Sequence, residues 1–309
     1  MKAVKFANGL KNVITASHDD ALLEAAAKAL GHLAKASPMP TNDFVDFELN
    51  RGLEWLCAGP QYGHRRLAAC LLLKELASCK PTLFFRIIGD FFERIWPVLR
   101  DARQSIRDAA ADAMAAALQV LAERPSPHHL EFLFRTYDQV SCLPSLVSLI
   151  FTVRYHNAIS SAQAHLSPIL PQVKISFGGN CEGVHASLRV AAAMVAHCPD
   201  FMAPRFDYLC ETVLSVAERP GRGGLAASLV RATVTRTLPV LAAFAPDAFA
   251  RRYLRPTLSV LTRDAQPGEV ATRRAQALLA LGHVCRSMGD QLLPHMEDLV
   301  KLVCVCAFE

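Results

Sequence analysis

The pattern of apolar and polar residues along this chain is that of amphipathic helices. The clearest stretch begins at Ile106, after which apolar residues recur at steps of three and four as far as Leu121. This spacing places them on one face of a helix, because an α-helix turns once about every 3.6 residues. The residues on that face are Ile106, Ala109, Ala110, Ala113, Met114, Ala117, Leu118 and Leu121. We therefore predict a helix with one apolar face over this stretch.

The same pattern recurs along the chain. Runs rich in Ala and Leu follow one another at about 40 to 47 residues, with one interval of roughly 80, which is the period of solenoids built from helix pairs. The runs begin near Ala21, His64, Ser105, His185, Leu225 and Thr272. Three runs end in small residues, then Pro, then an aromatic residue: Pro81 with Phe84, Pro199 with Phe201, and Pro246 with Phe249. We predict that each Pro ends one helix and that the aromatic residue begins the packing of the next.

These observations predict an all-α fold, an armadillo-like α-solenoid of about six to seven antiparallel helix pairs. Five pairs are readable in the sequence. They are Lys5–Ile14 with Ala21–Lys35, Asp43–Leu56 with His64–Cys79, Leu83–Leu99 with Ile106–Leu121, Phe201–Glu218 with Leu225–Phe244, and Pro246–Leu261 with Thr272–Met288.

The stretch from Arg124 to Gly183 departs from the pattern. Several Pro and Gly residues interrupt it, among them Pro125, Pro127, Pro168, Pro171, Gly178 and Gly179. Glu131–Val140 and Ser145–Tyr155 form at most a degenerate pair. We therefore expect repeats over residues 1–123, a divergent insert or degenerate repeat with loops over 124–183, and further repeats over 184–309.

Composition excludes several classes of protein. Of the 309 residues, 52% are hydrophobic and 20% are charged, which is typical of a folded chain and not of a disordered one. The net charge of +5 is a slight excess of Lys and Arg scattered along the sequence, unlike the concentrated positive charge of a nucleic-acid-binding surface. The longest apolar runs, such as Leu67–Leu73, are too short to span a bilayer, which needs roughly 18 apolar residues. A folded helical array remains.

The ten cysteines suggest neither a disulfide framework nor a zinc site. Most lie among apolar residues of predicted helices, and Cys304 and Cys306 are closer together than the usual zinc-ligand spacing. We expect buried free thiols. The opening residues lack the apolar segment of a secretory signal and the chain has no Asn-x-Ser/Thr acceptor, so we expect a reducing, intracellular compartment.

No catalytic signature lies on these helices. The phosphate-binding and dinucleotide-binding glycine motifs, the serine-hydrolase elbow, the zinc-protease motif and the kinase residue sets are all absent from the sequence. His128 and His129 have no third ligand nearby, which favours a surface loop over a metal site. The basic, Gly-rich stretch 218–224 has no aromatic neighbours to stack bases, which favours a turn over an RNA contact. We predict no enzyme activity within the chain, no cofactor and no metal.

Two sets of residues are candidates for contacts between repeats and with partners. Asp101 and Arg107 have the spacing found in HEAT repeats, where an Asp in a turn and an Arg in the second helix form a ladder between neighbouring repeats. The candidate partner-docking residues are large or positively charged, as binding hot spots commonly are: Trp55, Tyr62, Arg65, Arg66, Arg273 and Arg274. Trp55 could equally belong to the core, and the arginine pairs could be ladder contacts or a solvated edge.

The sequence also resembles a known family. The run Lys5-Phe6-Ala7-Asn8, then Lys28-Ala29-Leu30-Gly31-His32-Leu33, Phe44-Val45-Asp46-Phe47-Glu48 and Leu53-Glu54-Trp55-Leu56, looks like the N-terminal HEAT region of the target of rapamycin (TOR) protein kinases. Further matches follow in order as far as Ser105-Ile106-Arg107-Asp108-Ala109. A second block, from Leu238-Pro239 through Ala248-Phe249 to Leu281-Gly282, is similar to later repeats of the same family.

This resemblance implies a non-catalytic scaffold in TOR growth and nutrient signalling. The implied partners are Raptor-like or Rictor-like companion subunits, a Rheb-like GTPase and a TOR dimer mate, with no nucleic acid. It implies a cytoplasmic location, with peripheral contact to endolysosomal membranes or a nuclear pool through the parent complex. It also implies that the chain is one piece of a longer kinase. The alternatives are a stand-alone HEAT adaptor of the phosphatase-scaffold or transport type and a nucleic-acid-binding array.

Overall fold

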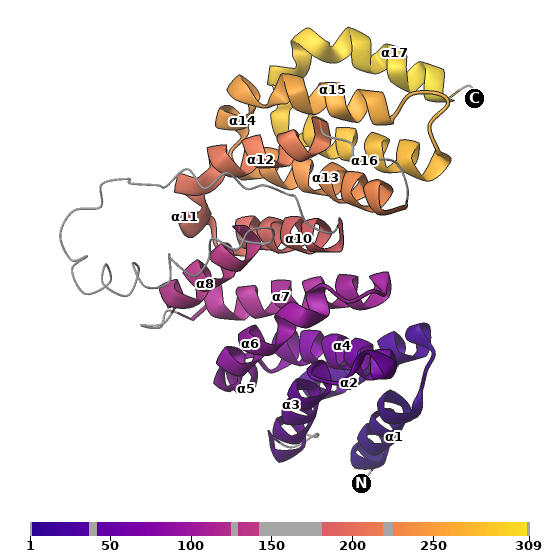
Figure 1. Cartoon of the computed structure of the whole chain (residues 1–309), viewed down its shortest axis with the longest axis vertical. Coiled ribbons are helices and arrows are strands. Elements are labelled where there is room, and N and C mark those ends of the chain that lie inside the picture. Colours follow the sequence, from indigo (N-terminus) through magenta and orange to yellow (C-terminus); the bar gives the residue numbers. More distant parts are fainter. Residues whose placement is uncertain (1, 37–41, 125–128, 142–180, 219–224, 308–309) are drawn as a thin grey trace, which may run out of the picture.

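The protein is an array of helices stacked along one long axis (Figure 1). The computed structural model describes residues 2–36, 42–124, 129–141, 181–218 and 225–307. Within these ranges the regular structure is entirely helical, without a strand. The predicted all-α class is therefore confirmed for the part of the chain that the structure describes.

The helices form two layers. The second helices of successive pairs pack directly on one another in sequence order. These inner helices are α2 (Asp20–Ala36), α4 (Gly63–Cys79), α7 (Gln104–Ala122), α10 (Cys181–His197), α13 (Leu225–Phe244) and α16 (Ala271–Met288). The outer layer contains α1 (Lys2–Ala16), α3 (Asn42–Leu56), α5 (Pro81–Arg86), α6 (Ile88–Leu99), α8 (His129–Ser141), α11 (Pro199–Met202), α12 (Phe206–Glu218), α14 (Pro246–Arg252), α15 (Leu254–Asp264) and α17 (Met296–Ala307). Three short 3-10 helices join them: η1 (Pro60–Tyr62), η2 (Ala203–Arg205) and η3 (Gly289–His295).

The predicted Pro-aromatic joints are confirmed. Pro81, Pro199 and Pro246 each occupy the first turn of an outer helix, where the missing N–H of Pro costs no hydrogen bond. Each follows a residue with non-helical backbone angles, such as Lys80 at φ −132° and ψ 59°. The aromatic residues Phe84, Phe201 and Phe249 are buried just after these prolines. The joints therefore turn the chain and anchor the next helix in the core.

Two predicted outer helices are interrupted. The helix expected over residues 83–99 is broken at Ile87, and the one expected from Pro246 to Leu261 is broken at Tyr253. Both residues have φ near −110° and ψ near zero, and the N–H of Tyr253 still bonds to the carbonyl of Phe249. A single straight helix would present Phe84 and Phe91 on a wide face, whereas the break lets both rings bury fully, 5.4 Å apart.

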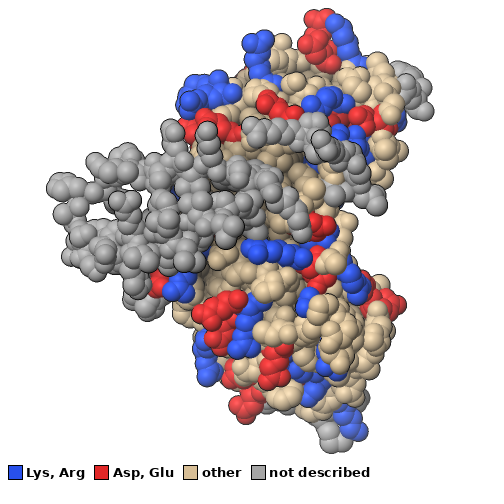
Figure 2. Space-filling view, in the orientation of Figure 1, with Lys and Arg blue, Asp and Glu red and all other residues tan. Residues whose placement is uncertain are grey.

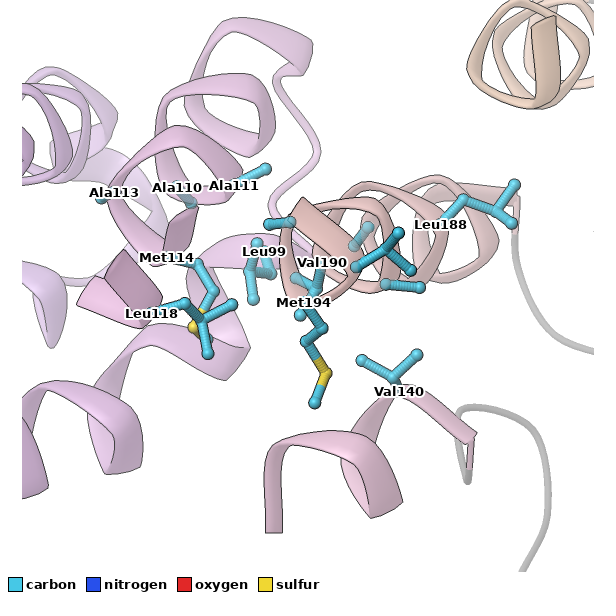
Figure 3. Packing of buried hydrophobic residues seen from close by; sticks show 14 of the residues in the cluster. Leu99, Ala110, Ala111, Ala113, Met114, Leu118, Val140, Leu188, Val190 and Met194 are labelled. Carbon is cyan, nitrogen blue, oxygen red and sulfur yellow. The ribbon is translucent and has the colours of Figure 1, made fainter. Parts of the chain in front are cut away.

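Part of the divergent segment 124–183 is an ordinary outer helix. α8 covers the predicted stretch 131–140, and its Phe132 ring stacks on Phe92 of α6 at 5.6 Å. In Figure 3, Val140 of α8 lies against the side of α10 that carries Met194. The predicted partner helix Ser145–Tyr155 lies outside the described residues. Helix α10 begins at Cys181, so the third predicted region starts within a helix.

Small side chains set how closely the inner helices approach. Ala110 and Ala113 of α7 are buried beside Met114 and Leu118. In Figure 3, Met114 and Leu118 lie on the side of α7 toward Val190 and Met194 of α10. Apolar area removed from water contributes roughly 25 cal/mol per Å². The continuous core that results runs from Ala7 to Leu302 and holds the described helices in one array.

The described cysteines are all free thiols. Cys70, Cys198 and Cys210 are buried, and burial raises the pKa of each thiol, that of Cys198 to about 11. The expectation of burial is wrong for Cys57 and Cys304, which are exposed. Cys57 lies just beyond the end of α3, in a turn, and Cys304 lies on the outer side of α17. Apolar neighbours in sequence therefore did not guarantee burial at these ends.

Candidate partner-docking site

A network of charged side chains crosses three inner helices. Arg189 of α10 donates from Nη1 to Asp108 at 2.9 Å and from Nη2 to Asp112 at 2.6 Å. Asp112 also accepts from Lys74 Nζ of α4 at 3.2 Å. The two aspartates are four residues apart, so they lie on one face of α7 and receive both neighbours. The network therefore fixes the register of α4, α7 and α10.

His185 extends this network to a fourth helix. Its ring is 2% exposed, with Nδ1 2.6 Å from Thr233 Oγ1 of α13 and Nε2 3.1 Å from Asp108 Oδ1. Burial by itself would raise the pKa of Asp108, but the hydrogen bond from His185 and the charge of Arg189 outweigh it and lower that pKa. Asp108 is therefore held as a carboxylate between two donors.

A groove of about 470 Å³ opens beside this network. It is lined by the N-terminal parts of α7, α10 and α16 and by the first and middle turns of α13. The charged lining residues are Arg107, Arg236 and Arg273 against the single carboxylate Glu182. Because four helices contribute to one wall, the groove is a product of the stacking and not of any single element.

The described lining of the groove does not form a metal site. Among the described residues there is no cluster of three His, Cys, Asp or Glu side chains that could hold a metal ion. Its lining combines arginines, amides and hydroxyls, which are groups that bind and orient. The three arginines in this lining suit recognition of an anionic group.

The predicted docking residues Tyr62 and Arg65 lie together at the start of α4. Tyr62 is 42% exposed, and the Arg65 guanidinium lies over its ring at 4.9 Å from the centroid. The ring of His64 is beside Tyr62 and lies 4.1 Å, centroid to centroid, from that of His18. This exposed aromatic and cationic cluster has the composition of a binding hot spot.

The side chains of the two predicted ladder residues, Asp101 and Arg107, do not pair with each other. Arg107 Nη1 donates to the backbone carbonyls of Asp101 and Ala102, at 2.7 and 2.8 Å. The carboxylate of Asp101 instead accepts from Arg66 Nη1 of the preceding pair at 2.6 Å, while Arg66 Nε donates to the Ala58 carbonyl. Arg66, a docking candidate, is thus occupied by a contact between pairs.

The remaining candidates are divided between the core edge and the groove. Trp55 is partly buried against the core, with the Arg51 guanidinium 4.5 Å from its ring centroid. Arg273 pairs with Glu269 one turn earlier and lines the groove together with Arg107. Arg274 lies next to it, partly buried, and also has an interaction partner. Sequence reasoning therefore placed Arg107 and Arg273 in separate roles that the fold brings into one groove.

Sequence reasoning missed Asp108, Asp112, His185, Arg189, Glu182 and Arg236. For four of these residues the sequence did contain a signal, a spacing of four residues between charged or polar side chains. Asp108 and Asp112 of α7 are four residues apart, as are His185 and Arg189 of α10, and both pairs interrupt Ala-rich faces. Glu182 and Arg236 had no comparable signal, because only the stacking of α10 and α13 brings them to one groove.

Charges of both signs are mixed over the surface. Figure 2 shows Lys and Arg interspersed with Asp and Glu on the visible face of the described residues. His129, a metal candidate, lies with Nδ1 3.0 Å from the Leu121 carbonyl oxygen. His128 and residues 219–224 lie outside the described part of the chain. No helix in the described ranges has the length and apolar character required to cross a bilayer.

The relatives of this chain are TOR kinases. It is 28% identical over 296 residues to "Serine/threonine-protein kinase TOR" of Oryza sativa, a match that covers 96% of this chain and 10% of the relative. The protein of the same name in Arabidopsis thaliana is 26% identical over 301 residues. "Serine/threonine-protein kinase tor1" of Schizosaccharomyces pombe is 25% identical over 299 residues. No family model matches the chain.

Nearly the whole chain is therefore homologous to a segment of TOR kinases. The chain spans only about a tenth of the length of these relatives, 10% for the two plant proteins and 11% for the yeast one. The activity in their names is that of the full-length relatives.

Proposed function

We propose that this chain is a non-catalytic protein-interaction scaffold, the N-terminal HEAT-repeat segment of a TOR kinase. The observation that supports it is the similarity of nearly the whole chain to a segment that makes up about one tenth of the length of TOR kinases. The helical architecture of the described residues agrees, because a protein kinase needs a strand-borne lysine and a glycine-rich loop over the nucleotide. In this proposal the kinase reaction takes place in other parts of a TOR protein.

The proposed role is to dock the other components of a TOR complex. The candidates are Raptor-like or Rictor-like companion subunits, a Rheb-like GTPase and a second TOR chain. The complex would act in growth and nutrient signalling in the cytoplasm, in contact with endolysosomal membranes or in the nucleus. A stacked array suits this role because it offers long helical ridges on which several small contacts add up.

The proposed docking edge is the start of α4. Tyr62 and Arg65 are exposed there, and stacking of the guanidinium on the ring holds both side chains in place before a partner arrives. Preorganised aromatic and arginine side chains lose little conformational entropy on binding. Arg66 and Trp55 would support this edge from behind, through the Asp101 ion pair and the core contact.

A pull-down with purified components tests the proposal. The tagged 309-residue chain is incubated with each companion subunit of the same organism and with the GTPase. Capture is expected, and Tyr62→Ala combined with Arg65→Ala should weaken it about tenfold, as loss of a hot spot does. The control variant replaces Arg251 and Arg255 with Ala. Both arginines are exposed, on α14 and α15. Capture of none of these components would refute the docking role.

The size of the native product separates this proposal from a stand-alone adaptor. An antibody raised against residues 59–80 is used to immunoblot cell extract. A band far above 33.7 kDa, the mass of this chain, is expected for a TOR kinase. A band at that mass would support a free HEAT scaffold instead.

A further inference from the structure

The groove beside His185 carries a net positive charge in its lining. Three arginines line it, Arg107, Arg236 and Arg273, against one lining carboxylate, Glu182, and Arg273 is also paired with Glu269 one turn earlier. Gln104, Glu182 and Thr272 belong to the first turns of α7, α10 and α16, where backbone N–H groups have no partner within the helix. The positive ends of these helix dipoles add to the charge of the arginines.

Two of the arginines have donors that the described residues leave unused. Arg107 is 4% exposed, and although Nη1 donates to two carbonyls, its buried Nε–H has no hydrogen-bond partner. Arg236 is exposed at the groove and has no ion pair or hydrogen bond among the described residues. A buried charged donor without a partner is costly, and an anion in the groove would relieve that cost.

The stretches that lead into α10 and α13 in the sequence are not acidic. The stretches that precede α10 and α13 in sequence, residues 142–180 and 219–224, contain no Asp or Glu. They carry Arg154, Lys174, Arg219 and Arg222 instead. These two stretches therefore supply no carboxylate for the arginines of the groove.

We propose that this groove binds an acidic peptide segment of a protein partner. Arginine guanidinium groups bind carboxylates through paired, charge-assisted hydrogen bonds, and three of them from separate helices can hold carboxylates spaced along one segment. The volume of about 470 Å³ lies within the roughly 300–1,000 Å³ of pockets that enclose small ligands, so the groove takes a few residues and not a folded domain.

A nucleic acid fits this surface less well. Proteins that follow a phosphate backbone use a continuous stripe of Lys and Arg. Here a carboxylate, Glu182, stands in the groove wall, and acidic side chains are mixed with basic ones on the visible surface in Figure 2. A short acidic peptide needs only the local positive charge of the groove.

The inference rests on the proposed scaffold function only in taking the occupant to be a protein. The groove is lined by α7, α10, α13 and α16, whereas Tyr62 and Arg65 lie at the start of α4. The two proposals can therefore fail separately, because peptide binding needs no companion subunit and the pull-down variants leave the groove intact.

Fluorescence anisotropy with a defined probe tests the groove. The probe is a fluorescein-labelled peptide of alternating Glu and Ser, titrated with the full 309-residue chain, and the reference probe has Gln in place of Glu. The acidic probe should bind, the Gln probe should not, and binding should weaken as salt rises from about 0.01 to about 0.15 M because the screening length falls from about 30 to about 8 Å.

Paired variants assign the binding to the groove. Arg236→Gln with Arg273→Gln should weaken binding about tenfold, since charge-assisted hydrogen bonds are lost. Arg251→Gln with Arg255→Gln makes the same change of charge on exposed α14 and α15 and should leave binding unchanged. Glu182→Gln, which removes the only wall carboxylate, should tighten binding about threefold. Helical circular dichroism checks that each variant is folded.

Three results would overturn the proposal. The first is equal binding of the acidic and Gln probes. The second is equal weakening by the groove pair and the control pair, which would assign the effect to net charge. The third is tighter binding of a single-stranded DNA oligonucleotide of equal charge, lost in the groove pair, which would make the groove a phosphate-binding surface.

Discussion

At the scale of single residues, buried polar side chains tie neighbouring helices together. His185 contacts Thr233 of α13 and Asp108 of α7 at the same time, and Asp108 also contacts Arg189. The next helix could slide along an interface of Ala and Leu alone at little cost. Polar contacts of fixed geometry prevent such slippage, because a shift leaves buried groups without partners.

Replacement of His185 by Ala should destabilise the protein by about 2–4 kcal/mol, because it leaves a cavity and removes one hydrogen-bond partner from Thr233 and one from Asp108. The measurement is urea unfolding followed by circular dichroism at neutral pH. His283→Ala is the control, because His283 is exposed on α16. Equal midpoints for both variants would show that the network does not hold the helices.

In contrast to Asp108, whose pKa is lowered, Glu48 is a carboxyl group whose charged form is disfavoured by burial. It is fully buried, Arg51 pairs with Oε2, and Oε1 has no hydrogen-bond partner, with Lys11 Nζ 4.0 Å away. Burial raises the pKa of Glu48, and the charges of Arg51 and Lys11 only partly offset this.

The raised pKa makes stability depend on pH. Since folding favours the protonated form, this contribution to stability is complete below the unfolded pKa of about 4.3 and is lost as pH rises through the folded pKa. Glu48→Gln removes the titration. Relative to the native chain, the variant should therefore gain stability as pH rises from about 4 to about 7, measured by urea unfolding. Exposed Glu54→Gln is the control, and parallel pH profiles for Glu48→Gln and the native chain would contradict the prediction.

At the scale of elements, the Pro-aromatic joints determine where each outer helix begins. Phe249 is fully buried three residues after Pro246, and Phe84 has the same place after Pro81. Phe249→Ala should cost about 3–5 kcal/mol, because a large cavity opens at the joint of α14 and α13. Thermal or urea unfolding measures the loss. Phe6→Ala, at a side chain that is 56% exposed, should change stability little. Similar losses for both would mean that the joint does not anchor the helix.

Much of the element order was predictable from sequence. The step pattern from Ile106 to Leu121 matches α7, and the three prolines mark the starts of α5, α11 and α14. These signals are local, since helix periodicity and the missing N–H of Pro act within one or two turns. Local chemistry therefore sufficed for helices and joints.

The break at Ile87 and the groove were not predictable in this way. Ile87 has no helix-breaking side chain, and the outer helix bends there because the rings of Phe84 and Phe91, on either side of the break, are both buried in the core. The break at Tyr253 differs, because Pro256 three residues later cannot donate a helical hydrogen bond to the Arg252 carbonyl. Arg107 and Arg273 are far apart in sequence and meet at one groove only because α7, α10, α13 and α16 stack. The break at Ile87 and the groove both depend on tertiary packing, which no window of sequence contains.

At the scale of the whole molecule, each helix pair contacts mainly its neighbours along the stack. The inner helices α7, α10 and α13 are packed on both sides, whereas α17 exposes about half of Val300, Val303 and Val305. In such an array stability is close to a sum of repeat and nearest-neighbour terms, so damage to one interface remains mostly local.

Met194→Ala in α10 tests this locality. Met194 is fully buried, and its truncation should destabilise by about 2–5 kcal/mol. Amide hydrogen exchange should then speed up most in α7, α10 and α13, and less in α2 and α16, because coupling passes only through successive interfaces. Leu279→Ala, at a side chain 67% exposed on α16, serves as the control and should leave exchange unchanged. A uniform loss of protection from α2 to α16 would instead mean that the stack unfolds as one cooperative unit, and a partner that stiffened one end would then stiffen the other.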